Sequence, residues 1–224
     1  EYIDGNQDEY LRRVREENPV RIRVSALYED FLHKPLGDIS WADGIKICAG
    51  RLADPDLMQH RAVFEQADRL GKFISIDLAD GRLQTAAMQR LAEEFPNLPM
   101  AIGHFGMVTR EGWQEQIALA KNPQVYIETG GITWLFHREF YPYPSAVKAI
   151  NEAADLVGFE KLMWGSDYPR TMTAITYKMS FDFIEKTTEI SKENKKLILG
   201  ENARKFYSFA DIPTPQKVRN MVED

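Results

Sequence analysis

Short apolar runs alternate with longer amphipathic stretches along most of the chain. Six of these runs are rich in Ile, Val or aromatic residues, and their continuous apolar character predicts strands that are buried on both faces. These predicted strands are Arg21–Leu27, Gly44–Ala49, Phe73–Leu78, Pro99–His104, Gln124–Thr129 and Lys161–Ser166. Between them, apolar residues recur with the helical period of about 3.6 residues. The predicted helices are Leu57–Leu70, Leu83–Phe95, Gly112–Lys121, Pro144–Val157 and Thr176–Glu189.

The alternation of strand and helix predicts an α/β fold with a parallel sheet and helices packed outside it. The sequence contains six strand–helix units, preceded by a helix-like segment, Gln7–Glu17. A TIM (β/α)8 barrel has eight units over about 250 residues. We therefore expect one barrel domain over residues 1–224 that lacks its first one or two βα units. A doubly wound open sheet is the alternative, although no glycine-rich nucleotide-binding motif follows the first strand.

Composition narrows the functional classes. The 224 residues carry 28 Lys and Arg against 34 Asp and Glu, a net charge of −6, which argues against a partner that is a nucleic acid or an anionic membrane. No apolar run approaches the roughly 18 residues that span a bilayer. Cys48 is the single cysteine, so an internal disulfide framework is excluded and a reducing, cytoplasmic location is expected. The first residue is Glu1, so a leader further upstream would not be visible.

Candidate chemistry gathers where predicted strands end. Asp77, His104 and Asp167 stand at three such ends, and the carboxyl ends of parallel strands form the working face of these folds. Convergence there would give metal ligands or an acid/base pair. The structural alternatives are a turn cap for Asp77, a hydrogen-bonded core histidine for His104 and a turn former for Asp167. His33 and His60 are expected at the surface.

Two further patterns concern substrate binding. The loops after the last five predicted strands each carry an arginine: Arg51, Arg82, Arg110, Arg138 and Arg170. A rim of guanidinium groups would suit a carboxylated substrate, because arginine binds carboxylates with a bidentate fork; chance placement in exposed loops is the alternative. The long loop from residue 130 to residue 143 is rich in aromatics and includes Trp134 and His137. It is predicted to cover the mouth of a pocket or to form an oligomer contact, and we expect a homo-oligomer.

Three segments together resemble a known family. AIGHFG (Ala101–Gly106), MWGSDYPR (Met163–Arg170) and GENARKFY (Gly200–Tyr207) are similar to the amidohydrolase-related branch of the amidohydrolase superfamily, and the likeness runs from about Gly5 to Phe209. That branch includes aminocarboxymuconate semialdehyde decarboxylase, resorcylate-type decarboxylases, pyrone dicarboxylate lactonase and sugar lactonases. The resemblance implies a (β/α)8 barrel whose site lies at the carboxyl ends of the strands.

The same resemblance implies roles for individual residues. Asp167 matches a metal-binding and proton-transferring aspartate, and His104 matches a histidine that polarises the substrate or the attacking water. Arg170 lies where it would contact a substrate carboxylate. The branch implies a divalent metal, zinc or manganese, with Asp167 and Asp77 as the ligands available here. However, the chain has no His-x-His pair, and Asp77 stands where metal-binding members carry another histidine.

These observations favour a hydrolase that acts on a lactone or a related ester or amide bond of a small carboxylated ring compound. Asp167 and His104 would be catalytic, and Arg170, Arg51, Arg110, Trp134 and His137 would bind the substrate. Nonoxidative decarboxylation on the same scaffold is the nearest alternative. A catalytically degenerate barrel that serves as a binding or assembly protein is the third hypothesis.

Overall fold

The computed structural model describes residues 7–28, 36–78 and 81–210. Within these ranges, six parallel strands form one sheet in the order β1-β2-β3-β4-β5-β6, so each strand pairs with the next one along the chain. The strands are β1 (Ser25–Tyr28), β2 (Gly44–Cys48), β3 (Phe73–Asp77), β4 (Met100–Ile102), β5 (Val125–Glu128) and β6 (Leu162–Met163). All six overlap the predicted strands.

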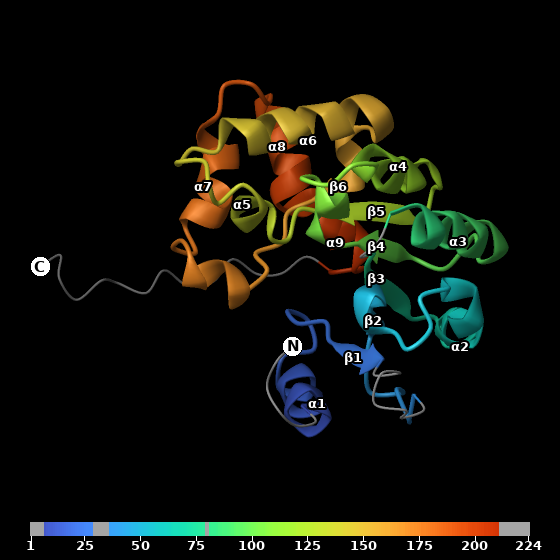
Figure 1. Ribbon diagram of the computed structural model, residues 1–224. Coiled ribbons are helices and arrows are strands. Elements are labelled where there is room, and N and C mark those ends of the chain that lie inside the picture. The colour runs from blue at the N-terminus through green and yellow to red at the C-terminus, as the bar shows by residue number, and fades with distance from the viewer. Residues whose placement is uncertain (1–6, 29–35, 79–80, 211–224) are drawn as a thin grey trace, which may run out of the picture.

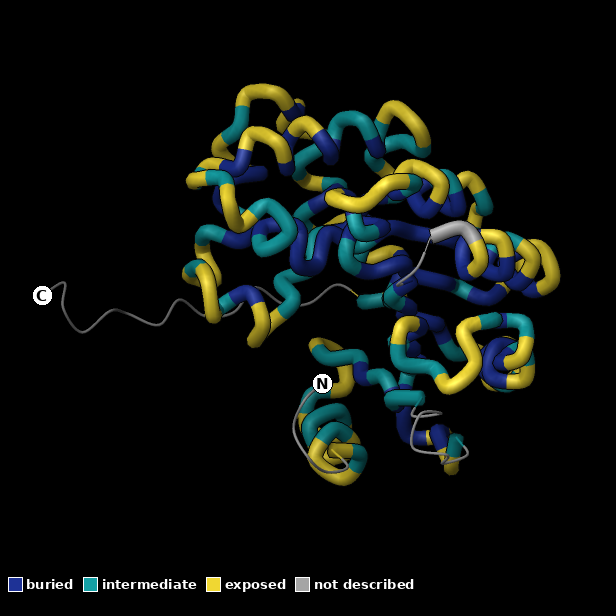
Figure 2. The backbone as a smooth tube through the Cα atoms, viewed as in Figure 1, coloured by how far each residue is buried: buried dark blue, intermediate teal, exposed yellow. Residues whose placement is uncertain are grey.

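From β2 onwards, helices connect successive strands, and they cover the sheet from outside (Figure 1). Their bounds are α1 (Asp8–Glu17), α2 (Arg61–Arg69), α3 (Gly81–Glu94), α4 (Trp113–Ala118), α5 (Ile132–Leu135), α6 (Pro144–Val157), α7 (Met179–Lys186), α8 (Lys192–Lys196) and α9 (Asn202–Phe206). Buried residues follow the strands and the inward faces of the helices, while the outer helix surfaces are exposed (Figure 2). None of the helices in the described ranges has the length and apolar character needed to cross a membrane.

All six strands are shorter than predicted, and for β1 and β6 the local cause is clear. The backbone N–H groups of Arg21 and Ile22 both donate to the carbonyl of Asn18, so this stretch forms a turn and β1 begins only at Ser25. At the other end of the sheet, the Trp164 N–H donates to the carbonyl of Ile198, which lies outside the sheet. The β6 ladder therefore ends at Met163.

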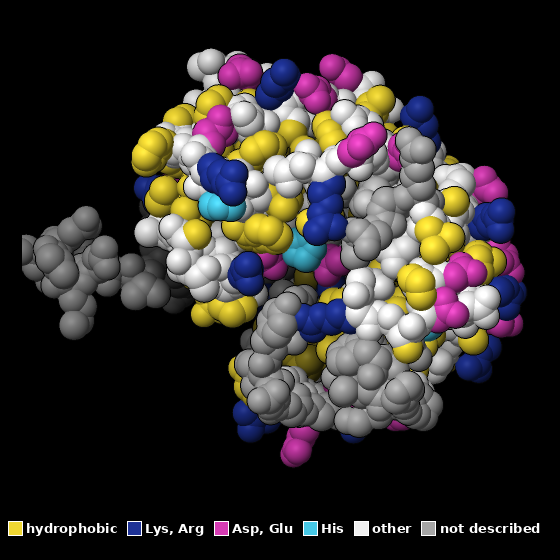
Figure 3. Space-filling view, in the orientation of Figure 1, with side chains coloured by type: hydrophobic (Ala, Val, Ile, Leu, Met, Phe, Trp, Pro, Cys, Tyr) yellow, Lys and Arg dark blue, Asp and Glu magenta, His cyan; other side chains and the backbone are white. Residues whose placement is uncertain are grey.

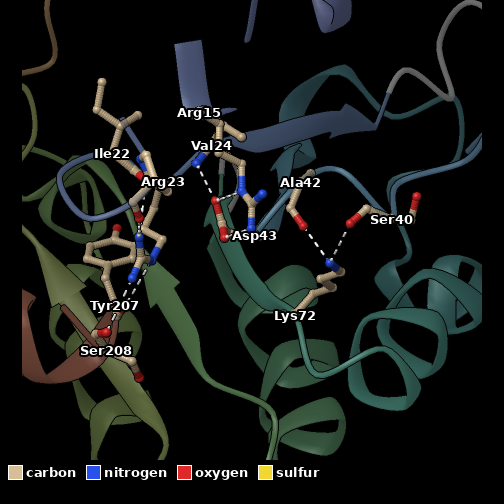
Figure 4. Close-up of polar contacts among 11 residues, drawn as sticks. Arg15, Ile22, Arg23, Val24, Ser40, Ala42, Asp43, Lys72, Tyr207 and Ser208 are labelled. Carbon is tan, nitrogen blue, oxygen red and sulfur yellow. Dashed lines mark hydrogen bonds and ion pairs between the residues drawn. The ribbon is translucent and has the colours of Figure 1, made fainter. Parts of the chain in front are cut away.

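The strand order separates the two architectures that the sequence left open. A doubly wound sheet reverses its strand order at a switch point, whereas a barrel adds each strand beside the previous one. The unbroken sequential order is that of a barrel, and in the described ranges β1 and β6 are not paired with each other, so the barrel is partial. Arg23, just before β1, donates to the carbonyls of Tyr207 and Ser208 beyond α9 and so ties the two ends of the fold together (Figure 4).

The inner face of the sheet has an apolar end and a charged end. Phe73, Ala101, Tyr126, Met163 and Phe206 pack together toward the amino ends of the strands, where α9 covers them. The parallel register places Lys46 beside Ser75, and Cys48 beside Asp77, at the carboxyl ends. Polar side chains on the inner face of a sheet need partners, because burying them without hydrogen bonds is costly. The charged end of the inner face is therefore the candidate functional region.

Two features outside this region differ from expectation. His60 is buried, not at the surface: its side chain contacts the Tyr28 hydroxyl and the carbonyl of Asp54, at 3.0 and 2.9 Å. The aromatic loop over residues 130–143 contains a short helix, α5. His33 lies outside the described residues.

Candidate active site

A cavity of about 300 Å³ opens at the carboxyl ends of the strands. Asp77, His104 and Asp167 line it together, as the strand-end pattern predicted. In the space-filling view, a histidine and acidic side chains lie in a hollow with Lys and Arg side chains around it (Figure 3). The volume is at the small end of the range for small-molecule sites.

His104 lies between the two aspartates. Its Nδ1 is 3.3 Å from Asp77 Oδ1, and its Nε2 is 3.8 Å from Asp167 Oδ1. Both distances are longer than an ordinary N–H···O hydrogen bond, so His104 has an ion-pair separation from each carboxylate, the closer one being that from Asp77. Both His104 and Asp167 have positive φ angles, 51° and 50°. Such backbone strain in residues other than glycine is concentrated at functional sites.

Lys46 forms an ion pair with the other carboxylate oxygen of Asp77. Its Nζ is 2.7 Å from Asp77 Oδ2, and both side chains are largely buried, at 19% and 15% exposure. Asp77 thus binds an ammonium group through one oxygen and the His104 ring through the other. This arrangement fixes the ring so that Nε2 is directed toward Asp167.

Asp167 is oriented by the aromatic loop. The Trp134 indole N–H donates to Asp167 Oδ2 at 2.6 Å, which leaves Oδ1 on the side of His104. The Arg170 guanidinium lies over the Trp134 ring, 5.4 Å from its centre. Trp134 therefore joins the predicted catalytic aspartate to the predicted carboxylate-binding arginine.

The charges of the cavity favour a charged Asp167–His104 pair. Burial opposes ionisation of Asp167, but the His104 ring and the Trp134 N–H outweigh it and lower the pKa of Asp167. Burial also opposes the imidazolium form of His104, yet the carboxylates of Asp167 and Asp77 raise the pKa of its ring. Near neutral pH, these shifts favour an aspartate and an imidazolium that face each other across the cavity.

Lys46 and Glu128 also line the cavity and were not predicted from the sequence. Burial, with the charges of Asp77 and Asp167, raises the pKa of Glu128, while Lys46 and His104 act in the opposite direction. Glu128 ends β5, so the strand-end rule that selected Asp77 would also have selected it. Lys46 lies within β2, and its signal is a lone charged residue inside an apolar run.

The remaining predicted binding residues are less central. The residues that line the cavity do not include Arg51, Arg110, Arg170 or Trp134, although Trp134 contacts Asp167 directly. His137 is exposed, and its Nδ1 contacts the Trp134 carbonyl at 2.7 Å. Their predicted contacts with substrate remain predictions.

The family follows from the sequence as a whole. A family model described as Amidohydrolase matches residues 7–209. The chain belongs to the amidohydrolase family. No curated protein matches it.

Solved structures agree with the fold of this amidohydrolase. An amidohydrolase from Burkholderia multivorans with bound zinc matches with a TM-score of 0.70 and 17% identity, over 92% of this chain and 81% of that chain. A protein named "probable 2-pyrone-4,6-dicarboxylic acid hydrolase" from Acinetobacter baumannii, with citric acid bound, gives 0.69 and 18%, over 93% and 81%. The 2,6-dihydroxybenzoate decarboxylase complexed with 2,6-dihydroxybenzoate gives 0.60 and 15%, over 90% and 72%. At these identities the likeness establishes the fold.

The donor set of the described residues does not fit a metal centre. Within residues 7–28, 36–78 and 81–210, no three His, Cys, Asp or Glu side chains come together in a group that could hold a metal ion. Asp77, one of the two predicted ligands, already binds the Lys46 ammonium, and Asp167 accepts the Trp134 N–H. A zinc or manganese site needs about four to six ligands, so the predicted metal role of Asp77 and Asp167 gains no support here.

The position of Asp77 depends on a glycine of the same amidohydrolase site. A Cβ atom on Gly103 would overlap Asp77 Oδ1, although the Gly103 backbone itself suits any residue. We expect Gly103→Ala to displace Asp77 and to lower catalytic activity at least about tenfold, at a stability cost of about 1–3 kcal/mol from overpacking. Gly200→Ala is the matched control, because nothing lies within 4 Å of its Cβ position. Steady-state kinetics and thermal melts of both variants test this; equal activity in the two variants would contradict it.

Proposed function

We propose that this amidohydrolase hydrolyses a lactone or a related ester or amide bond of a small carboxylated ring compound. The observation that carries the proposal is the pair formed by Asp167 and His104. The two side chains come from different strand ends, and their reactive atoms are 3.8 Å apart across the cavity. At that separation, an oxygen atom that lies beside the pair can contact both a base and a hydrogen-bond donor.

Each residue then has a defined task. Asp167 accepts a proton from the attacking water through Oδ1, while Trp134 holds Oδ2. His104 donates from Nε2 to the carbonyl oxygen, which becomes negative as water adds. The Asp77 carboxylate, 3.3 Å from Nδ1, keeps the ring in this orientation through its charge. Arg170, which lies over the Trp134 ring, would bind a carboxylate of the substrate.

The relatives named above suggest the first substrates to try. One has a name that includes 2-pyrone-4,6-dicarboxylic acid hydrolase, and another is a 2,6-dihydroxybenzoate decarboxylase. We would incubate the purified protein with 2-pyrone-4,6-dicarboxylate, a panel of sugar lactones and 2,6-dihydroxybenzoate, and measure acid release and carbon dioxide release separately. Acid release without carbon dioxide supports the proposal. Release of carbon dioxide would replace it with decarboxylation, and no turnover would favour a binding protein.

The indole of Trp134 provides a prediction within this scheme. Trp134→Phe keeps an aromatic ring at this position but removes the indole N–H that binds Asp167. The pKa of Asp167 should therefore rise, and its carboxylate should lose its orientation. Hydrogen bonds to charged groups contribute about 1.5–3 kcal/mol, so we expect kcat to fall about tenfold or more. Trp41→Phe is the control, because its N–H binds the carbonyl of Asp38, outside the cavity. Equal kcat values for the two variants would show that the indole does not orient Asp167.

A further inference from the structure

Among the described residues that line the cavity, Lys46 is the one lysine or arginine. It lies within β2, between Ile45 and Ile47, which are both fully buried in the core on the outer side of the sheet. The alternation of a strand therefore turns Lys46 to the inner face, where the register places it beside Ser75. Burial of an ammonium group is costly unless other groups pair with it, so the partners of Lys46 on the inner face need to be identified.

The ion pair with Asp77 accounts for only part of the ammonium group. An ammonium has three N–H donors, and Asp77 Oδ2 accepts at 2.7 Å. In the described part of the chain, no other hydrogen bond or ion pair of Lys46 is found. The cavity that Lys46 lines is the place where the other donors can meet an acceptor, and a substrate oxygen can provide one.

The surroundings of Lys46 favour its charged form. Burial lowers the pKa of Lys46, but the adjacent Asp77 carboxylate outweighs burial, and the net shift is upward. A lysine that acts as a nucleophile or forms a Schiff base must lose its proton near neutral pH. Lys46 is therefore suited to act as a fixed positive charge and hydrogen-bond donor.

We propose that the Lys46 ammonium binds an anionic oxygen of the substrate, and so supplies at the reacting carbonyl the positive charge for which the described residues offer no metal site. This inference rests on the proposed function. It adds that the Lys46 ammonium is the group that polarises the substrate carbonyl. The Asp77 carboxylate contacts Lys46 through one oxygen and the His104 ring through the other, and both cationic groups would then stabilise the developing oxyanion. The proton of the attacking water still goes to Asp167.

Three variants and a control test this inference. Lys46→Met removes the charge at similar length, and Lys46→Arg keeps a charge. The double variant Lys46→Met with Asp77→Asn removes both members of the ion pair, so that no unpaired buried carboxylate complicates folding. Lys72→Met is the matched control, because Lys72 binds the carbonyls of Ser40 and Ala42 away from the cavity (Figure 4). Thermal melts establish which variants fold.

Two readouts separate this inference from the proposed function. The first is kcat on whichever lactone the wild-type protein hydrolyses, measured after treatment with a chelator. We expect Lys46→Met to lose about 10²-fold or more, with Lys46→Arg partly active. The second is the affinity for citrate, by calorimetry, which requires no turnover. We expect citrate to bind at least about tenfold more weakly to Lys46→Met and to the double variant than to Lys72→Met.

The outcomes are decisive in either case. If the wild-type protein hydrolyses a lactone and Lys46→Met keeps its kcat, the inference fails while the proposed function stands. If the wild-type protein hydrolyses no lactone, the proposed function fails and citrate decides: weaker binding by both Lys46→Met proteins supports the ammonium as an anion-binding group. Citrate affinity that is unchanged in these variants, or absent in the wild-type protein, overturns it.

Discussion

Asp167→Asn is expected to lower kcat about 10³-fold while the protein stays folded. Asparagine has nearly the same shape and still accepts the Trp134 N–H, but it cannot take a proton from water. Positioned general bases contribute roughly 10²–10⁴-fold to the rate, and the polarising donors of the site would remain. Steady-state kinetics on the substrate identified above, together with thermal melts, measure both effects.

Asp155→Asn is the control for this substitution. Asp155 is exposed on α6 and makes no contact with the cavity, so its variant should keep wild-type kinetics. If Asp167→Asn retained more than about a tenth of the wild-type kcat, a base other than Asp167 would have to act.

His104→Gln is expected to lower kcat about 10²-fold and to change the pH profile. The loss corresponds to the removal of one donor to a developing oxyanion. In the wild-type protein, kcat/KM should fall on the acid side as Asp167 is protonated, below the ordinary pKa of 3.8, because that pKa is lowered. On the alkaline side it should fall as His104 loses its proton, above the ordinary 6.5, because that pKa is raised. The glutamine variant should have no alkaline limb from this residue.

The position of the alkaline limb of kcat/KM in an Asp77→Asn variant tests whether that limb belongs to His104. The Asp77 carboxylate raises the pKa of His104, and Lys46 lowers it. Asp77→Asn removes the first influence and leaves the second, so the alkaline limb should move to lower pH. A limb that stays in place in Asp77→Asn, or persists in His104→Gln, would assign it to another group.

The architecture could be predicted because it depends on patterns that the sequence shows directly. Parallel strands are buried on both faces, so they appear as continuous apolar runs, and all six runs overlap strands. The residues at which strands end were harder to predict. β6 ends where Trp164 pairs with Ile198, a contact between residues far apart in the sequence that no local pattern encodes.

The candidate site could be predicted in part for the same reason. Asp77, His104 and Asp167 lie together because parallel strands align their carboxyl ends, and this is a property of the topology. Lys46 could not be predicted from its position in the sequence, because it lies inside a strand and its role depends on which face of the sheet its side chain occupies. The arginines were selected for their place in loops, and loop position does not determine whether a side chain reaches the cavity. Of the five, Arg170 is linked to the site through Trp134.

The incorporation of water oxygen into the product tests the proposed hydrolysis most directly. Hydrolysis in oxygen-18-labelled water, followed by mass spectrometry of the product, reports whether water attacks the acyl carbon. The account predicts that the wild-type protein places labelled oxygen in the new carboxylate at every turnover, and that Asp167→Asn does so only at its much lower rate. A product without labelled oxygen that has lost carbon dioxide, or labelling by Asp167→Asn at the wild-type rate, would contradict it.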